Sequence, residues 1–148
     1  MKIKKVSDND KLNYKELLLL ADEQWNMVEK YLYQGEMYVL FEDEVIGSCI
    51  VTGEGKGNYE LKSLAVYPSY QRQSYGKQLV EFILQHYKSK GHTMYVGTGA
   101  SPITLGFYKH CGFKYSHSVK NFFTDNYDEP IFEAGVQLVD MIYLKHEL

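Results

Sequence analysis

The 148-residue chain lacks a long hydrophobic run and an excess of basic residues. Its longest early apolar stretch, residues 17–21, is far shorter than the roughly 20 residues that cross a bilayer. No leader peptide is visible after Met1, because charged residues follow it directly. The 16 Lys and Arg face 19 Asp and Glu, for a net charge of −3. This balance excludes a broad basic surface for nucleic acid. We expect a cytoplasmic protein with no membrane and no nucleic-acid partner.

Cysteine and histidine are also scarce. Cys49 lies in a strand-like run, and Cys111 lies far from it in the sequence, beside Gly112. This usage favours two buried, unpaired thiols, with a disulfide or a catalytic thiol as the alternatives. The five histidines show no metal-type spacing with one another or with cysteine. We therefore expect no metal site.

The sequence shows no boundary between domains. No internal repeat, low-complexity tract or linker interrupts it, and its length is sufficient to bury a sizeable core. Hydrophobic residues make up 45% of the chain, and 14 of the aromatic residues are Tyr, which pack while keeping a polar hydroxyl. We expect residues 1–148 to form one domain.

Hydrophobic periodicity predicts the helices and strands. Apolar residues at helical spacing indicate a helix from Gly76 to Lys90, with Gly91 as the C′ residue that ends it. Residues 53–58, "GEGKGN", are predicted as a flexible loop, and a loop of about 16 residues separates the last two strands. The predicted strands are 1–7, 36–42, 45–52, 59–66, 92–98, 113–119 and 136–144, and the predicted helices are 10–21, 24–33, 76–90 and 102–111.

The central strand–helix–strand unit determines the class of fold. The helix at 76–90 connects strands 59–66 and 92–98, and such a crossover joins parallel strands. Before this unit the order is strand, two helices and two strands, and after it the order is helix and two closing strands. This order predicts an α+β fold with a mixed sheet.

A polar turn without acidic residues, "SYQRQSYGKQL" (69–79), leads from strand 59–66 into helix 76–90. The first turn of a helix has unpaired N–H groups and the positive end of the helix dipole, so the turn predicts an anion site. Neither the GxxxxGK[ST] spacing of a P-loop nor the GxGxxG spacing of a dinucleotide loop is present. An ordinary solvated turn is the alternative.

The same turn resembles the acetyl-coenzyme A motif of the GNAT N-acetyltransferase superfamily, Gln/Arg-x-x-Gly-x-Gly/Ala. It matches as Gln71-x-x-Ser74-x-Gly76. The first glycine of the motif lets the backbone approach a pyrophosphate, and Ser74 replaces it here. Serine is the least bulky polar replacement, and its hydroxyl can itself donate to a phosphate oxygen.

A second stretch, "SPITLGFYKHCGF" (101–113), is similar to the Asn-x-x-Ala-x-x-x-Tyr-x-x-x-Gly-Phe helix of that superfamily. The matching residues are Tyr108, Gly112 and Phe113, and the departures are Ser101 for Asn and Thr104 for Ala. The resemblance implies a GNAT-type mixed, mostly antiparallel central sheet flanked by helices. In such a sheet the parallel pair 59–66 and 92–98 forms the cofactor cleft.

The resemblance implies acetyl-CoA as co-substrate. Backbone N–H groups of residues 71–77 are expected to hold its pyrophosphate, and the side chains of Arg72 and Lys77 either add charge or are simply exposed. The amide of Leu64 or Val66 is expected to polarise the thioester carbonyl. The cofactor-binding residues predicted in this way are Leu64, Ala65, Val66, Gln71, Arg72, Gln73, Ser74, Tyr75, Gly76, Lys77, Ser101 and Tyr108.

The resemblance also implies two catalytic residues. Tyr108 stands where the superfamily places a tyrosine that protonates the leaving thiolate, and packing alone is the alternative. Glu60, sixteen residues before Gly76, stands where histone-acetyltransferase members carry a glutamate. A lysine-like amine with a pKa of about 10.4 must lose a proton before it attacks, so Glu60 is the candidate base. An ordinary exposed strand residue is the alternative.

Residues 122–144 contain no Lys or Arg, and we expect this segment to form an acidic rim on the acceptor side. Such a rim favours a small-molecule or peptide substrate with a cationic amine; a solvated loop or a homodimer contact is the alternative. A coenzyme A-binding sensor without turnover is the alternative to the enzyme. The predicted rim comprises Asp125, Asp128, Glu129, Glu133 and Asp140, opposite Asp22, Glu23 and Trp25.

Overall fold

A seven-stranded sheet organises residues 2–148, the part of the chain that the computed structural model describes. Its strand order is β1-β2-β3-β4-β5-β9-β6, and every neighbouring pair is antiparallel except β4–β5. The α+β class, the mostly antiparallel sheet and its parallel pair are therefore confirmed. The sheet consists of β1 (Lys2–Val6), β2 (Glu36–Phe41), β3 (Val45–Gly55), β4 (Asn58–Val66), β5 (Thr93–Thr98), β6 (Lys114–Val119) and β9 (Met141–Glu147).

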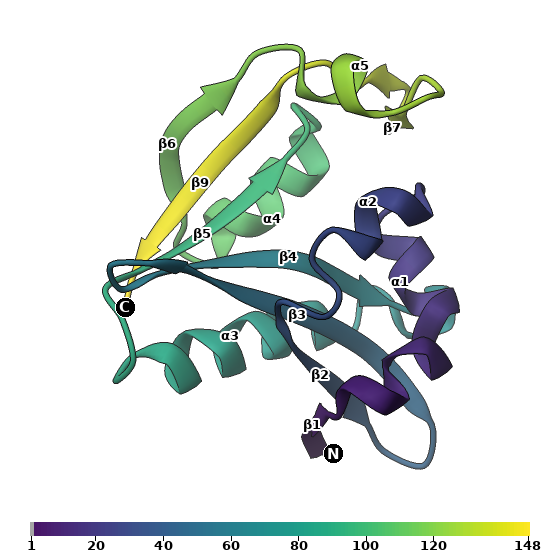
Figure 1. Ribbon diagram of the computed structural model, residues 1–148, viewed down its shortest axis with the longest axis vertical. Coiled ribbons are helices and arrows are strands. Elements are labelled where there is room, and N and C mark those ends of the chain that lie inside the picture. Colours follow the sequence, from purple (N-terminus) through teal and green to yellow (C-terminus); the bar gives the residue numbers. More distant parts are fainter. Residues whose placement is uncertain (1) are drawn as a thin grey trace.

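The helices cover both faces of the first strands (Figure 1). Side chains of a strand alternate between faces, so Tyr38 and Leu40 of β2 pack with α3, whereas Met37 and Val39 pack with the N-terminal helices. No helix within residues 2–148 is both long and apolar enough to cross a membrane. The helices are η1 (Asp8–Tyr14), α1 (Lys15–Ala21), α2 (Trp25–Glu29), η2 (Pro68–Tyr70), α3 (Tyr75–Tyr87), α4 (Pro102–His110) and α5 (Phe122–Asn126).

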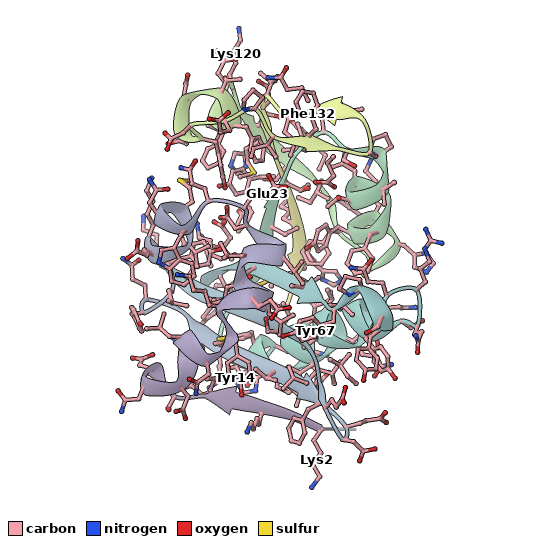
Figure 2. The ribbon with its side chains drawn as sticks, turned by 90° about the vertical axis from the view of Figure 1, so that its right-hand side faces the viewer. Lys2, Tyr14, Glu23, Tyr67, Lys120 and Phe132 are labelled. Carbon is pink, nitrogen blue, oxygen red and sulfur yellow. The ribbon has the colours of Figure 1, made fainter. Side chains whose placement is uncertain are left out.

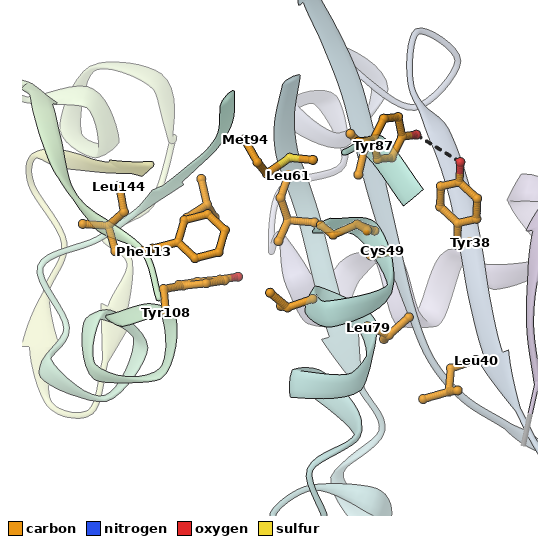
Figure 3. Close-up of a cluster of buried hydrophobic side chains, with 14 of the residues drawn as sticks. Tyr38, Leu40, Cys49, Leu61, Leu79, Tyr87, Met94, Tyr108, Phe113 and Leu144 are labelled. Carbon is orange, nitrogen blue, oxygen red and sulfur yellow. Dashed lines mark hydrogen bonds between the residues drawn. The ribbon is translucent and has the colours of Figure 1, made fainter. Parts of the chain in front are cut away.

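The larger core cluster joins the two halves of the sheet (Figure 3). Leu61 of β4 and Met94 of β5 lie between α3 on one side and Tyr108 and Phe113 on the other. The buried hydroxyls of Tyr38 and Tyr87 both have hydrogen-bond partners. They lie 3.0 Å apart, and the Tyr87 hydroxyl also donates to the Glu36 carboxylate.

Strands β4 and β5 pair over only part of their length. Their register runs from Asn58 opposite Thr93 to Leu61 opposite Val96, and residues 62–66 have no partner on β5. A bulge also interrupts the β3–β4 pairing, where Ile50 lies opposite Ser63 and Val51 lies opposite Leu61. A bulge bends its strand and increases the local twist. The carboxyl ends of the two parallel strands therefore separate, and this separation positions the site described below.

The prediction of a flexible loop at residues 53–58 is wrong. Strand β3 continues to Gly55 and β4 begins at Asn58, so Lys56 and Gly57 alone connect them. Both residues have positive φ, +56° and +79°, as a two-residue hairpin of matching twist requires. The glycine-rich sequence therefore encodes a tight turn.

The two N-terminal helices differ from the prediction. The first begins earlier, at Asp8, and is a 3₁₀ helix up to Tyr14 before α1 continues it to Ala21. The second is shorter than predicted and ends at Glu29, although its apolar pattern continues to residue 33. A buried lysine from the earlier segment explains this end. Lys11 donates to the carbonyl oxygens of Leu32 and Gly35, both at 2.7 Å, and satisfies backbone groups that a longer helix would otherwise use.

Gly91 does not end α3 in a left-handed conformation. The helix stops at Tyr87, and Gly91 has no positive φ. A Cβ at residue 91 would lie 2.5 Å from the Gly57 carbonyl oxygen and 2.6 Å from the Tyr59 ring. Close packing against the β3–β4 turn thus requires glycine here. Gly112, with φ +98°, does follow α4 as predicted.

The long connection before the last strand has structure of its own. It contains α5 and a two-stranded hairpin, β7 (Phe132–Glu133) with β8 (Val136–Gln137). Ala134 and Gly135 have φ of +52° and +78° and form the hairpin turn. The predicted closing strand at 136–144 therefore divides into β8 and the later β9.

Candidate active site

The separation of β4 and β5 opens a cavity of about 440 Å³. Residues 61–64 of β4 and 96–99 of the β5 segment form two of its walls. Thr104 and Tyr108 of α4 form a third wall, and the cavity also contacts residues 20–23 at the end of α1 and the β7–β8 region. Glu23 and Phe132, which both line it, lie one above the other in Figure 2. We call this the strand cavity.

Peptide groups of β4 are directed into the opening. The Tyr67 amide donates to the Ile46 carbonyl at 3.0 Å, across to β3. Successive peptide groups of a strand point to opposite sides, so those of Leu64 and Val66 point away from β3, while that of Ala65 points toward it. The Leu64 and Val66 amides therefore face the opening and the Ala65 amide faces β3, and the contact of these three residues with a ligand stays a prediction.

The turn before α3 has the form of an anion cradle. Arg72 and Ser74 both have left-handed backbones, with φ of +63° and +69°. Within residues 2–148, no backbone amide from Arg72 to Lys77 donates to a protein acceptor. Alternating left-handed and ordinary residues direct successive N–H groups toward one point, the arrangement that holds phosphate in other proteins.

The side chains of the turn shape it. Gln71 donates to the Val66 carbonyl at 3.0 Å, and Gln73 donates to the Ser69 carbonyl at 3.3 Å. Tyr75 packs edge-on against the Tyr70 ring. These contacts leave the backbone amides of residues 72–77 unpaired in the described chain, with the exposed Arg72 side chain beside them, and their binding of an anion stays a prediction.

Three further predicted residues lie at helix ends. Lys77 is 3.9 Å from Glu81 one turn along α3. A Cβ at Gly76 would meet the Phe107 ring of α4 at 3.4 Å, an ordinary contact. Ser101 is fully buried at the start of α4 and is not part of the cavity lining, so its contact with a ligand stays a prediction.

Tyr108 lines the strand cavity. Its ring packs against Phe107 and Phe113, with centroids 5.0 and 5.7 Å away. Its hydroxyl, which Figure 3 shows directed away from α4, has no hydrogen-bond partner within residues 2–148. Burial raises the pKa of this hydroxyl above its ordinary value, with smaller contributions from Cys111, Cys49 and Glu133. Tyr108 is therefore a neutral O–H donor without a protein acceptor.

Glu60 lines a second cavity of about 290 Å³, on the face of the sheet that α2 covers. We call this the acidic cavity, because Glu54 and Glu60 both line it. Glu60 is 9% exposed and pairs with Lys62 at 3.0 Å. Burial raises the pKa of the Glu60 carboxyl, and the nearby Lys62 ammonium opposes the shift. A raised pKa makes a carboxylate a better base at neutral pH.

The two cavities are adjacent. They share lining residues from β4, from β5, from β9, from the end of α1 and from the segment after α5. Tyr108 lies in the strand cavity and Glu60 in the acidic cavity, so the structure places the two predicted catalytic side chains on either side of one junction. The shared residues are Asp22, Leu61, Lys62, Gly97, Tyr127 and Met141.

The acidic rim differs from the prediction. Of its acids after residue 120, only Glu133 lines a cavity, where it accepts a hydrogen bond from Thr104. The Asp140 carboxylate instead accepts from the Asn121 amide at 2.9 Å. On the opposite side Asp22 and Glu23 line the strand cavity, whereas Trp25 packs into the smaller core cluster. Asp22 and Tyr127, hydrogen-bonded across 105 residues of sequence, match no local motif.

The remaining predictions concern thiols and metals. Cys49 and Cys111 are both free, the first buried and the second partly buried, as expected. In the described part of the chain, no three His, Cys, Asp or Glu side chains come together as a metal would need.

Comparison with known proteins agrees with this geometry. The profile of the "Acetyltransferase (GNAT) domain" family matches residues 33–115. The N-acetyltransferase YvbK of Bacillus subtilis (strain 168), described as uncharacterised, is 38% identical over 143 residues, 95% of this chain and 91% of that protein.

Two solved structures are similar over nearly their whole length. A GNAT family acetyltransferase from Elizabethkingia anophelis with acetyl-CoA bound is 35% identical, with a TM-score of 0.92 over 99% of this chain and 97% of the other. A B. subtilis acetyltransferase in complex with CoA is also 35% identical, with a TM-score of 0.90 over 99% and 98%. The separated strands, the open turn before α3 and these similarities together show that the chain belongs to the GNAT family of N-acetyltransferases.

Proposed function

We propose that this protein transfers an acetyl group from acetyl-CoA to a primary amine by direct attack in a ternary complex. The observation that carries the proposal is the pair of adjacent cavities, which share six lining residues, with Tyr108 in one and Glu60 in the other. Acetyl-CoA can enter through the strand cavity while an amine enters through the acidic cavity. The acetyl-CoA bound to the similar E. anophelis enzyme supports the first half of this assignment.

The residues present fit acetyl-CoA as substrate. The free amides of residues 72–77 suit its pyrophosphate, and the outward peptide groups of Leu64 and Val66 suit its amide-bearing arm. A carbonyl oxygen that accepts from one of these β4 amides becomes more polarised as negative charge develops on it. The thioester supplies an activated acetyl group, and the protein contributes binding, orientation and proton transfer.

The proton transfers are assigned to Tyr108 and Glu60. The amine nitrogen attacks the carbonyl carbon, its proton passes to Glu60 directly or through water, and the carbon–sulfur bond breaks. The departing thiolate takes the Tyr108 proton. A tyrosine whose pKa is raised by burial stays protonated through the neutral range, as a donor must.

The charge of the cavities favours a cationic acceptor. The acidic cavity, through which the amine enters, is lined by three carboxylates and by Lys30 and Lys62, and Lys62 pairs with Glu60. The carboxylates are Asp22, Glu54 and Glu60. Carboxylates beside aromatic walls attract ammonium groups. We propose a small amine or a peptide amine that is protonated in solution and gives up its proton at the junction.

The test is an amine panel assayed for released thiol. Wild-type protein with acetyl-CoA should release coenzyme A in proportion to added amine, with one acetylated amine formed for each thiol. A protein that only sensed coenzyme A would bind acetyl-CoA in calorimetry and release no thiol with any amine. That result would contradict the proposed activity and would leave the family assignment unchanged.

A further inference from the structure

Asp22 differs from the other carboxylates of the site because it lines both cavities and accepts several hydrogen bonds without an ion pair in the described chain. It is partly buried directly after α1 and lines both cavities at their junction. Within residues 2–148 no Lys, Arg or His nitrogen comes within the 4.0 Å of an ion pair with it, and Lys30 acts on it only from farther away. A carboxylate withdrawn from water without a counter-ion is unusual, because burial disfavours its charge.

The other carboxylates at the cavities already have partners. Glu60 pairs with Lys62, Glu54 accepts from the Thr52 hydroxyl at 2.7 Å, and Glu133 accepts from Thr104. Glu23, the next residue after Asp22, is exposed to water. Among these carboxylates Asp22 is the one that lines both cavities, and the described chain offers it hydrogen bonds but no cation within 4.0 Å.

Hydrogen bonds fix the Asp22 carboxylate in one orientation. Tyr127 donates to Oδ1 at 2.8 Å, and the Gln24 amide donates to the same oxygen at 3.4 Å. Tyr31 donates to Oδ2 at 3.4 Å. A carboxylate can accept about four hydrogen bonds, so a site on Oδ2 is left for a ligand.

The segment after α5 is tied to the same point. Gln24 donates from its side chain to the Asn126 carbonyl at 3.3 Å and accepts from the Asp128 amide at 2.9 Å. The Tyr127 ring stacks on Phe123, which also lines the strand cavity. Phe123 and Tyr127 thus form an aromatic wall beside the Asp22 carboxylate, and Gln24 ties this wall to the segment after α1.

We propose that Asp22 binds the ammonium group of the acceptor at the junction of the two cavities, and that Tyr127 is a positioning residue that orients its carboxylate. The inference rests on the proposed function and names the acceptor class for it: an aliphatic ammonium carried on an apolar or aromatic body. An N⁺–H donor on Oδ2 supplies the missing counter-charge, and the Tyr127 and Phe123 rings contact the body. Glu60 then acts on the bound amine.

The experiment compares Asp22→Asn with Asp125→Asn as a matched control. Asp125 lies on α5, is exposed and lines neither cavity, so both variants lose one charge in the same region. Asp22→Asn should raise the KM for amines about tenfold or more, with the KM for acetyl-CoA changed less than twofold. Asp125→Asn should leave both values within twofold of wild type.

A binding titration separates this inference from the activity. Trp25, the only tryptophan, lies three residues after Asp22 and reports binding by fluorescence. Wild-type protein should bind 2-phenylethylammonium more tightly than uncharged 2-phenylethanol, and Asp22→Asn should lose that preference. If wild type acetylates no amine, the proposed function fails, and the titration alone decides whether Asp22 binds ammonium.

Equal amine KM values in Asp22→Asn and Asp125→Asn would overturn the inference. Equal affinities of wild type and Asp22→Asn for 2-phenylethylammonium in the titration would also overturn it. Thermal melting shows whether each variant is folded. If Asp22→Asn does not fold, Tyr127→Phe carries the test, because it keeps the ring and removes the 2.8 Å hydrogen bond. It should raise the amine KM several-fold without changing the affinity for 2-phenylethanol, and an unchanged KM would count against the proposal.

Discussion

Replacing Tyr108 by Phe tests the proton donor with little structural disturbance. The ring contacts with Phe107 and Phe113 are retained, and the hydroxyl that is lost has no protein partner to leave unsatisfied. The free energy of unfolding should therefore change by less than about 1 kcal/mol. The affinity for acetyl-CoA should also be unchanged.

The expected loss is confined to turnover. If thiolate protonation limits the reaction, kcat should fall by about 10- to 10⁴-fold, which corresponds to roughly 1.4 to 5.5 kcal/mol in the barrier. The KM for the amine should stay near its wild-type value, because the hydroxyl acts when the carbon–sulfur bond breaks. Thiol release gives kcat, calorimetry gives acetyl-CoA affinity, and thermal melting gives stability. An unchanged kcat would show that water or another group protonates the thiolate.

Three other changes test the turn, the base and the fold. Ser74→Gly should keep or raise acetyl-CoA affinity in calorimetry because a left-handed backbone at φ +69° suits glycine, whereas Ser74→Val should abolish binding; equal affinities would refute the cradle. Glu60→Gln should lower kcat, and the difference from wild-type kcat should shrink at high pH, where free amine is abundant. Wild-type kcat/KM should fall at low pH as the Glu60 carboxylate is protonated, and a loss of kcat that does not change with pH would argue against a base. Gly91→Ala should destabilise by about 1–3 kcal/mol because its Cβ would lie 2.5 Å from the Gly57 oxygen, whereas Gly106→Ala, with open space around it, should be neutral or stabilising in the same melts.

The parts of the site that could be predicted are local in sequence. The turn 71–77 and α3 are contiguous, and the tyrosine of α4 follows at a fixed spacing, so motif and periodicity suffice to place them. The parallel pairing of β4 and β5 follows from the single helix between them. These elements need no knowledge of distant contacts.

The parts that were missed depend on distant contacts. The second helix ends early because Lys11 reaches the Leu32 and Gly35 carbonyls from a separate segment. Asp22 and Tyr127 meet only when the chain after α5 folds back over the end of α1. The composition of residues 122–144 shows that this segment is acidic. Which of its acids lines a cavity depends on the β7–β8 hairpin, which carries Glu133. Tertiary contacts of this kind leave no periodic trace in sequence.

Mass spectrometry of the protein during a single turnover tests direct transfer most directly. The protein is first incubated with acetyl-CoA alone, and an amine accepted in the panel is then added. Direct attack predicts an unmodified protein mass before the amine is added, followed by acetylated amine and free coenzyme A in equal amounts. A protein that gained the mass of one acetyl group and lost it to the amine at the rate of turnover would contradict the ternary-complex mechanism.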